Sequence, residues 1–332
     1  MADTVSESGG QAEGESPSLA AEFEAVKQRS LWMDALERMV RNKAAVIGGI
    51  IATMVILMAV VGPYVAPYDY LRNDFSRIAE APSMDHWMGT DVLGRDFTSR
   101  IFNGARTAVF VAVVVLVIST TVGVTLGATA GFVGRWVDDV IIRIGELLSA
   151  FPNILMAAFL SVTMREPVTI FLADLYAKTA WDILNQRIYI DYFLMFGAIS
   201  ATEWVGYARL VRGQVLSLKE MGFIRAERAL GVPQKMIITK HLVPNAISPI
   251  IVSVSAGVGG VMLTESTLSF LGLGIQPPAA SWGNMVSENL TRWRYDPHLV
   301  VMPGMVLAIA VFGFNFLGDG LNDALNPRAI QR

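Results

Sequence analysis

Three carboxylates stand within or beside long apolar stretches of the sequence, where an ionisable side chain is costly and often serves a proton or ion path. They are Glu146, Glu203 and Glu265. Glu146 follows Arg143 by three positions, so a local pair on one helix accounts for it. Two interpretations stay open for Glu203: it lines a translocation path, or it hydrogen-bonds a neighbouring helix. Glu265 ends another apolar stretch, and we retain Glu203 and Glu265 as candidates for a translocation path.

No other residues have the spacing of a catalytic or metal site. The chain has no cysteine, no Gly-x-x-x-x-Gly-Lys-Ser/Thr phosphate loop and no Gly-x-Ser-x-Gly elbow. Its three histidines, His86, His241 and His298, belong to separate segments without metal-ligand spacing. The net charge of −3 gives no indication of nucleic-acid binding. We therefore expect no catalytic residue, no metal site and no bound cofactor, so that any energy source lies outside this chain.

The elements that position these residues are long and apolar. The chain is 53% hydrophobic and only 17% charged, against about 25% charged residues in a typical soluble domain. A membrane helix needs roughly 20 apolar residues. Six stretches are predicted as spans: Ala44–Ala66, Thr107–Phe132, Leu147–Met164, Tyr192–Ala208, Ala246–Leu263 and Leu299–Leu317. We predict an all-α polytopic membrane protein with about six transmembrane helices in contact with the lipid bilayer.

The distribution of Lys and Arg predicts the orientation of these spans, because cytoplasmic loops are enriched in both. The stretch before the first span and the loop between spans four and five are basic, so both are expected in the cytoplasm, and six spans place both termini there. The predicted regions are a cytoplasmic tail (1–43), the first span (44–66), an external loop (67–106), a core (107–320) and a cytoplasmic tail (321–332).

The amino-terminal tail is expected to be retained, because it lacks the early apolar run of a secretory signal. Its last part carries one apolar helix face, made of Trp32, Ala35, Leu36, Met39 and Val40. This amphipathic helix has two open interpretations. It lies on the membrane surface, or it packs against a partner subunit.

The cytoplasmic loop at 217–245 is the most informative stretch. Phe223–Leu230 suits a helix of about two turns, with Phe223, Ala226 and Leu230 on one side. Gly231 can supply the left-handed residue that ends it, and Pro233 prevents its resumption. Such a short helix between two spans can fit a groove in a partner. The alternative is a solvated basic loop.

This loop resembles the coupling loop of ABC importer permeases, whose pattern is Glu-Ala-Ala, three residues, Gly, and nine residues before a segment that ends in Leu-Pro. Here Arg225-Ala226-Glu227 occupies the first slot, Gly231 follows after three residues, and Val243-Pro244 stands where Leu-Pro is usual. The chain departs from the pattern at Arg225, Glu227 and Val243. The resemblance implies an ATPase-coupling site made of Phe223, Arg225, Ala226, Glu227, Ala229, Leu230, Gly231 and Pro244.

Three further blocks are similar to the dipeptide/oligopeptide/nickel permease family, and in particular to its second (C-type) permease subunit. They are Gly89–Arg106, Glu265–Gly283 and Gly318–Arg328, in that order. The resemblance covers roughly residues 30–328. It implies the type I permease fold of ABC importers and a place in a bacterial inner membrane.

The resemblance also implies a mechanism of alternating access and a set of partners. These are a homologous second permease, two ABC ATPase subunits that use ATP and Mg²⁺, and an extracytoplasmic substrate-binding protein. Peptides are the expected substrate, while nickel complexes, glutathione or another small solute stay open. An ion-coupled secondary transporter is the rival function, and it would use the carboxylates at membrane depth.

Two features stand apart from these motifs. Residues 165–191 form an external insertion with an apolar stripe at helical spacing, made of Leu172, Leu175, Tyr176, Thr179, Ala180, Ile183 and Leu184. It is interpreted as an interfacial helix or, alternatively, as a contact for the binding protein. Gly123, Gly127 and Gly131 fall on one face of the second span, and they predict a close approach of another helix.

Overall fold

A computed structural model describes residues 31–181 and 187–325. Regular structure in these ranges is helical, apart from an isolated bridge between Thr90 and Asp96. The helices of eight or more residues are α2 (Leu31–Arg41), α3 (Lys43–Val60), α5 (Phe97–Val133), α6 (Arg135–Ser149), α7 (Asn153–Thr179), α8 (Arg187–Leu218), α9 (Gly222–Ala229), α12 (Ile247–Phe270), α13 (Trp282–Asn289) and α14 (His298–Leu325). The predicted all-α class is confirmed.

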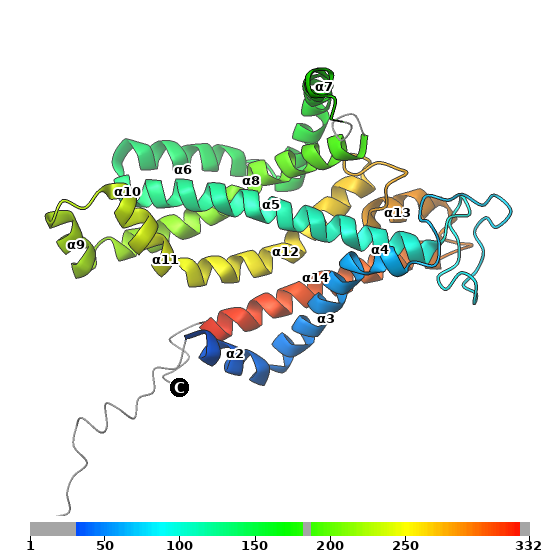
Figure 1. Cartoon of the computed structure of the whole chain (residues 1–332), viewed down its shortest axis with the longest axis horizontal. Helices are drawn as coiled ribbons and strands as arrows, with labels where there is room; N and C mark the ends of the chain where they lie inside the picture. The colour runs from blue at the N-terminus through cyan, green and yellow to red at the C-terminus, as the bar shows by residue number, and fades with distance from the viewer. Residues whose placement is uncertain (1–30, 182–186, 326–332) are drawn as a thin grey trace, which may run out of the picture.

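Five of these helices are long and apolar enough to cross a membrane, namely α3, α5, α7, α12 and α14. The remaining predicted span, Tyr192–Ala208, lies inside α8, which has 32 residues. It is not among the five; Glu203 lies within it, and Arg209 and Arg212 follow it in α8. The ribbon of α8 nevertheless runs alongside α5 within the bundle (Figure 1).

Prolines correct the boundaries of two predicted spans. The stretch predicted as one helix from Ala44 to Ala66 is divided, since α3 ends at Val60 and the four-residue α4 (Gly62–Val65) contains Pro63. The stretch Leu147–Met164 is divided as well, because α6 ends at Ser149 and α7 begins after Pro152. Proline has no backbone N–H to continue a preceding helix, and it disfavours helical geometry in the residue before it.

The three glycines of α5 lie against α8, as the sequence predicted. A Cβ at Gly123 would stand 2.5 Å from the Cβ of Tyr207, and a Cβ at Gly127 would overlap the backbone of Ala208. At Gly131 it would stand 3.0 Å from the carbonyl oxygen of Arg212. The two backbones therefore approach more closely than side chains would allow, and this contact fixes α8 relative to α5.

The bundle has two differently built ends (Figure 1). The α9 end carries α9, the three-residue α10 (Gln234–Met236), a π-helix (Ile237–Leu242) and the start of α6. The α13 end carries the irregular residues 67–96, the start of α5, and α13, which is followed by a 3₁₀ turn (Leu290–Arg292). The α9 end holds the loop at 217–245, and the α13 end holds the motif residues of Gly89–Arg106 and Glu265–Gly283.

A buried ion network holds the α13 end together. The guanidinium group of Arg100 is fully buried, and its Nη1 lies 2.6 Å from a carboxylate oxygen of Asp91 and 2.9 Å from one of Glu288. Arg95 pairs with the same two carboxylates, at 2.6 and 2.8 Å. The motif Gly89–Asp96 is thus a structural clamp, because it joins the start of α5 to α13.

The insertion continues α7 as a helix to Thr179, and Ala180 adopts a left-handed conformation after it. This agrees with the predicted stripe, except that Ile183 and Leu184 fall outside the described residues. The base of the insertion is tied down where Arg165 pairs with Asp191 at 2.8 Å. Asp191 also accepts a hydrogen bond from the backbone N–H of Gln276, so the insertion is joined to the segment between α12 and α13.

Candidate coupling surface

The short helix predicted in the loop at 217–245 forms within one residue of its predicted bounds. α9 begins at Gly222 and ends at Ala229, and the backbone N–H of Leu230 donates to the carbonyl oxygen of Ala226. Gly231 then has φ +74°, a left-handed conformation that glycine adopts without strain. The predicted conformation of Gly231 is confirmed, whereas its role in coupling stays a prediction.

One buried side chain anchors α9. Ile224 is fully buried and packs in a cluster with Val215, Ile237 and Leu242 from α8 and the π-helix. The remaining apolar side chains point outward, and Leu230 is 82% exposed. Sequence reasoning missed Ile224 as the anchor, since its neighbours on the inner face of α9 are charged and give no apolar periodicity.

The predicted coupling residues form the outer side of this helix. Exposed positions are Phe223, Arg225, Ala226, Ala229, Leu230 and Gly231, while Glu227 is half-buried. Arg225 pairs with Glu220 on the surface, at 2.8 Å. The structure thus brings together two bulky apolar side chains, small alanines and a cation on one accessible surface, which we call the coupling surface.

Glu227 is one of the positions at which the chain departs from the coupling-loop pattern, and its side chain lies beside His241. The Oε1 of Glu227 lies 3.2 Å from the Nδ1 of His241, an ion pair when the imidazole is protonated. The backbone carbonyl of Glu227 accepts from the N–H of Val232. This half-buried pair joins α9 to the π-helix. Glu227 and His241, which are separate positions of the same motif, are therefore in contact.

The segment after α9 returns to the bundle through unusual helical geometry. Its π-helix runs from Ile237 to Leu242, and both of these side chains are fully buried. π-helical turns occur often at functional sites. Pro244 opens the next three-residue helix, α11 (Val243–Asn245), where its missing N–H costs no helical hydrogen bond. Pro244 therefore lies outside the coupling surface, between the π-helix and α12.

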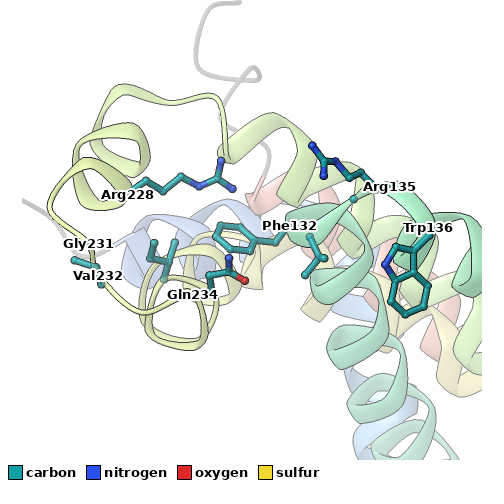
Figure 2. A pocket seen from close by; sticks show the side chains of 10 residues that line it. Phe132, Arg135, Trp136, Arg228, Gly231, Val232 and Gln234 are labelled. Carbon is teal, nitrogen blue, oxygen red and sulfur yellow. The ribbon is translucent and has the colours of Figure 1, made fainter.

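A pocket of about 690 Å³ separates α9 from the start of α6 (Figure 2). The guanidinium group of Arg228 lies over the ring of Phe132, 4.4 Å from its centroid. Arg135 and Trp136 form the opposite wall. Sequence reasoning missed these three α5 and α6 residues, although an arginine beside a tryptophan at a helix end is typical of a membrane–water boundary.

Ion pairs and hydrogen bonds hold the base beneath the coupling surface. Arg212 of α8 donates two hydrogen bonds to Asp138 of α6, at 2.5 and 2.6 Å. The hydrogen bond from Arg212 lowers the pKa of Asp138 below its ordinary value. The ammonium group of Lys219 donates to the carbonyl oxygen of Gly131 at the end of α5. These contacts join α5, α6 and α8 to one another beneath α9.

The two candidate path residues occupy different environments. Glu265 is fully buried, and its carboxylate accepts hydrogen bonds from Ser266, Ser269 and Ser281, at 3.1, 2.8 and 2.8 Å. It thereby joins α12 to the first turn of α13. Glu203 is half-buried on α8, one helical turn before Tyr207. The structure does not bring the two carboxylates into one site, and their roles in a path stay predictions.

Comparison with known proteins identifies the family of the chain. The family described as "Binding-protein-dependent transport system inner membrane component" matches residues 123–331. The family described as "N-terminal TM domain of oligopeptide transport permease C" matches residues 30–82. Together these matches cover most of the membrane bundle, the insertion and the coupling surface.

Individual relatives match nearly the whole length. The chain is 38% identical over 302 residues to the oligopeptide transport system permease protein OppC of Bacillus subtilis, which covers 91% of each chain. It is 40% identical to the protein of the same name from Haemophilus influenzae, over 90% of this chain and 89% of that one. The dipeptide transport system permease protein DppC of Bacillus subtilis is 36% identical, over 92% and 89%. The described part of this helical chain has five helices able to cross a membrane and a short glycine-ended helix at one end, and the chain belongs to the family of binding-protein-dependent transport system inner membrane components.

Proposed function

We propose that the chain is a permease subunit of an ATP-driven importer and moves peptides into the cytoplasm by alternating access. The names of its relatives, which are oligopeptide and dipeptide transport permeases, support peptides as the substrate class. The observation that carries the coupling role is the construction of α9. One apolar side chain of this helix, Ile224, is buried in the bundle, while Phe223 and Leu230 stay exposed.

The proposed complex contains a homologous second permease, two ABC ATPase subunits and an extracytoplasmic binding protein. The ATPase subunits use ATP and Mg²⁺, and each is expected to dock on one coupling surface. The contact residues in this chain are proposed to be Phe223, Arg225, Ala226, Glu227, Ala229, Leu230 and Gly231, with Pro244 fixing the exit of the loop. Exposed aromatic and aliphatic side chains beside an arginine suit the centre of a protein interface.

The proposed location is a bacterial cytoplasmic membrane, with both termini in the cytoplasm. The excess of Lys and Arg near α9 and before α3 supports this orientation. It places the α9 end toward the ATPases and the α13 end toward the binding protein. Helix α7 stands out from the side of the bundle (Figure 1), and Asp191 ties its insertion to the segment between α12 and α13, so it is then available as a contact for that protein.

The test is uptake by the whole complex in proteoliposomes. Inward movement of labelled peptide should require binding protein and ATP on opposite sides of the membrane, and it should continue when protonophores remove the proton gradient. The rival function, an ion-coupled transporter that uses the half-buried Glu203, predicts the reverse. Uptake that continues without ATP and stops on collapse of the gradient would establish that rival and refute our proposal.

A further inference from the structure

A second pocket, of about 570 Å³, opens near the α13 end. Its walls come from α3, α4, α5, the start of α8 and the segment before α13. The polar or aromatic members of its lining are Tyr64, Tyr70, Asn103, Arg106, Thr107, Phe110, Tyr189 and Tyr192. None of the predicted site residues belongs to it.

Arg106 carries the only charge among the described residues that line this pocket. Its side chain is exposed, and within the ranges 31–181 and 187–325 it has no ion pair or hydrogen bond. The other arginines near the start of α5, Arg95 and Arg100, are both neutralised by carboxylates. An unpaired cation on a membrane-spanning helix is costly, so an anion from outside the chain is the expected partner.

The aromatic walls around Arg106 are held in fixed positions. The hydroxyl group of Tyr192 lies 3.1 Å from that of Thr107, which itself donates to the carbonyl oxygen of Ala280 at 2.7 Å. The ring of Phe110 meets the edge of Tyr192, with centroids 5.4 Å apart. Through Thr107, Tyr192 thereby links α8, α5 and the segment before α13. A change in the spacing of these elements would therefore change the shape of the pocket.

The exposed face of α5 continues from the pocket toward the α9 end. After Arg106 and Phe110 it presents Val113 and Val117, and then Thr121 and Thr125. Each threonine hydroxyl donates to the carbonyl oxygen four residues earlier. Small hydroxyl residues on a membrane helix are typical of contact with protein or of a polar path.

We propose that this pocket binds the carboxylate of a peptide substrate, with the Arg106 guanidinium group as its ion-pairing partner and the tyrosines as hydroxyl donors and apolar walls. The pairing is bidentate in the geometry that arginine and carboxylate groups prefer. The inference rests on the proposed function, since it requires a peptide to reach the α13 end of the chain. It adds a preference for substrates with a free carboxyl terminus, set by the permease itself.

The experiment compares two peptide mixtures in the complete reconstituted complex. One contains alanine tri-, tetra- and pentapeptides with free carboxyl termini, and the other contains the same peptides as terminal amides. Wild type and Arg106→Gln share the same binding protein, so a change in the acid-to-amide uptake ratio reports the permease alone. We expect Arg106→Gln to lower this ratio about tenfold, the usual weight of one charge-assisted contact. Arg106→Lys should restore part of it.

The matched control is Arg294→Gln, which removes an exposed arginine that follows α13 and lies outside the pocket. This variant should retain the wild-type ratio. An equal loss of both mixtures in Arg106→Gln would overturn the pocket inference while leaving peptide import intact. The absence of ATP-driven uptake of either mixture by wild type would instead contradict the proposed function. If the difference between wild type and Arg106→Gln appears only in vesicles that contain anionic lipid and disappears in phosphatidylcholine alone, an anionic lipid headgroup pairs with Arg106 and the inference is wrong.

Discussion

The guanidinium group of Arg228 stacks on the ring of Phe132, 4.4 Å from its centroid, and this contact joins α9 to the end of α5. The two residues are almost a hundred positions apart, and neither stands out in the sequence. An exposed cation–π contact contributes about 0.5–1 kcal/mol. It therefore gives α9 a third attachment, besides Ile224 and the pair of Glu227 with His241.

Removal of this stacking should weaken coupling more than folding. We expect Arg228→Gln to lower peptide uptake per ATP hydrolysed about two- to fivefold, because α9 would transmit less of the ATPase movement to α5. The measurement is uptake and ATPase activity in the same proteoliposomes. Lys235→Gln, which removes an exposed cation of the neighbouring α10, is the control. Equal coupling ratios in wild type and Arg228→Gln would contradict this role.

Gly231 can be tested against a glycine at the other end of α9. A Cβ added at Gly231 or at Gly222 would meet no atom within 4 Å, but only Gly231 has a positive φ. Gly231→Ala should cost about 1–2 kcal/mol of local strain, and Gly231→Val more. Both should reduce coupled uptake, whereas Gly222→Ala should not. Asn tolerates the left-handed conformation, so Gly231→Asn should retain most activity. Normal uptake by Gly231→Val would refute the requirement.

A substitution at Glu265 tests whether this residue stabilises the fold or lies on the translocation path. Glu265→Ala would leave three buried serine hydroxyls without their acceptor, and it should destabilise the protein by about 2–4 kcal/mol. The readout is the apparent melting temperature in detergent, followed by tryptophan fluorescence. Glu146→Ala, which removes an exposed carboxylate from α6, should leave that temperature unchanged. A variant that melts normally yet fails to transport would instead place Glu265 on the path.

Glu288 should make the α13 end pH-dependent. Burial raises the pKa of Glu288 to about 7, although Arg95 opposes this shift. Because the folded protein then retains a proton that the unfolded chain has released, stability falls as pH rises from the unfolded pKa to about 7. Relative to Glu288→Gln, the wild-type melting temperature should decrease between pH 5 and 8, by the equivalent of about 1–3 kcal/mol.

The control for that titration is Glu166→Gln, which neutralises an exposed glutamate on α7. Its difference from wild type should not vary with pH. A constant difference between wild type and Glu288→Gln over the same range would show that Glu288 stays ionised beside its two arginines.

The glycine face of α5 should not tolerate even one methyl group at its centre. A Cβ at Gly127 would overlap the backbone of Ala208, which cannot move as a flexible side chain would. Gly127→Ala should therefore cost about 1–3 kcal/mol and separate α5 from α8. Gly206→Ala adds the same methyl group to α8 where nothing lies within 4 Å. Comparable melting temperatures for the two variants would show that the helices do not depend on this contact.

Sequence patterns predicted the parts of the fold that depend on local chemistry. The apolar stretches located the five long membrane helices, Gly231 located the end of α9, and the spacing of Gly123 and Gly127 predicted a close helix contact. Each of these follows from backbone geometry or from hydropathy within one segment. Pro63 and Pro152 mark two helix breaks in the sequence. These breaks were not predicted, because the apolar stretches continue past both prolines.

Contacts between distant segments could not be predicted in the same way. Ile224 becomes an anchor only because α8 and the π-helix surround it, and Phe132 joins the coupling region only through Arg228. The ion network that Glu288 shares with Arg95 spans 193 positions. A single sequence holds no signal for such pairs, because charge complementarity alone allows many alternatives.

The clamp at the α13 end also bears on the order in which the protein is made. Between positions 91 and 100 the chain carries two aspartates and two arginines, so this stretch has no net charge before any later segment exists. Arg95 and Arg100 can pair with Asp91 as soon as that stretch leaves the ribosome. Glu288 joins them only after nearly two hundred further residues have been synthesised. The clamp can thus begin assembly early, and the arrival of α13 completes it.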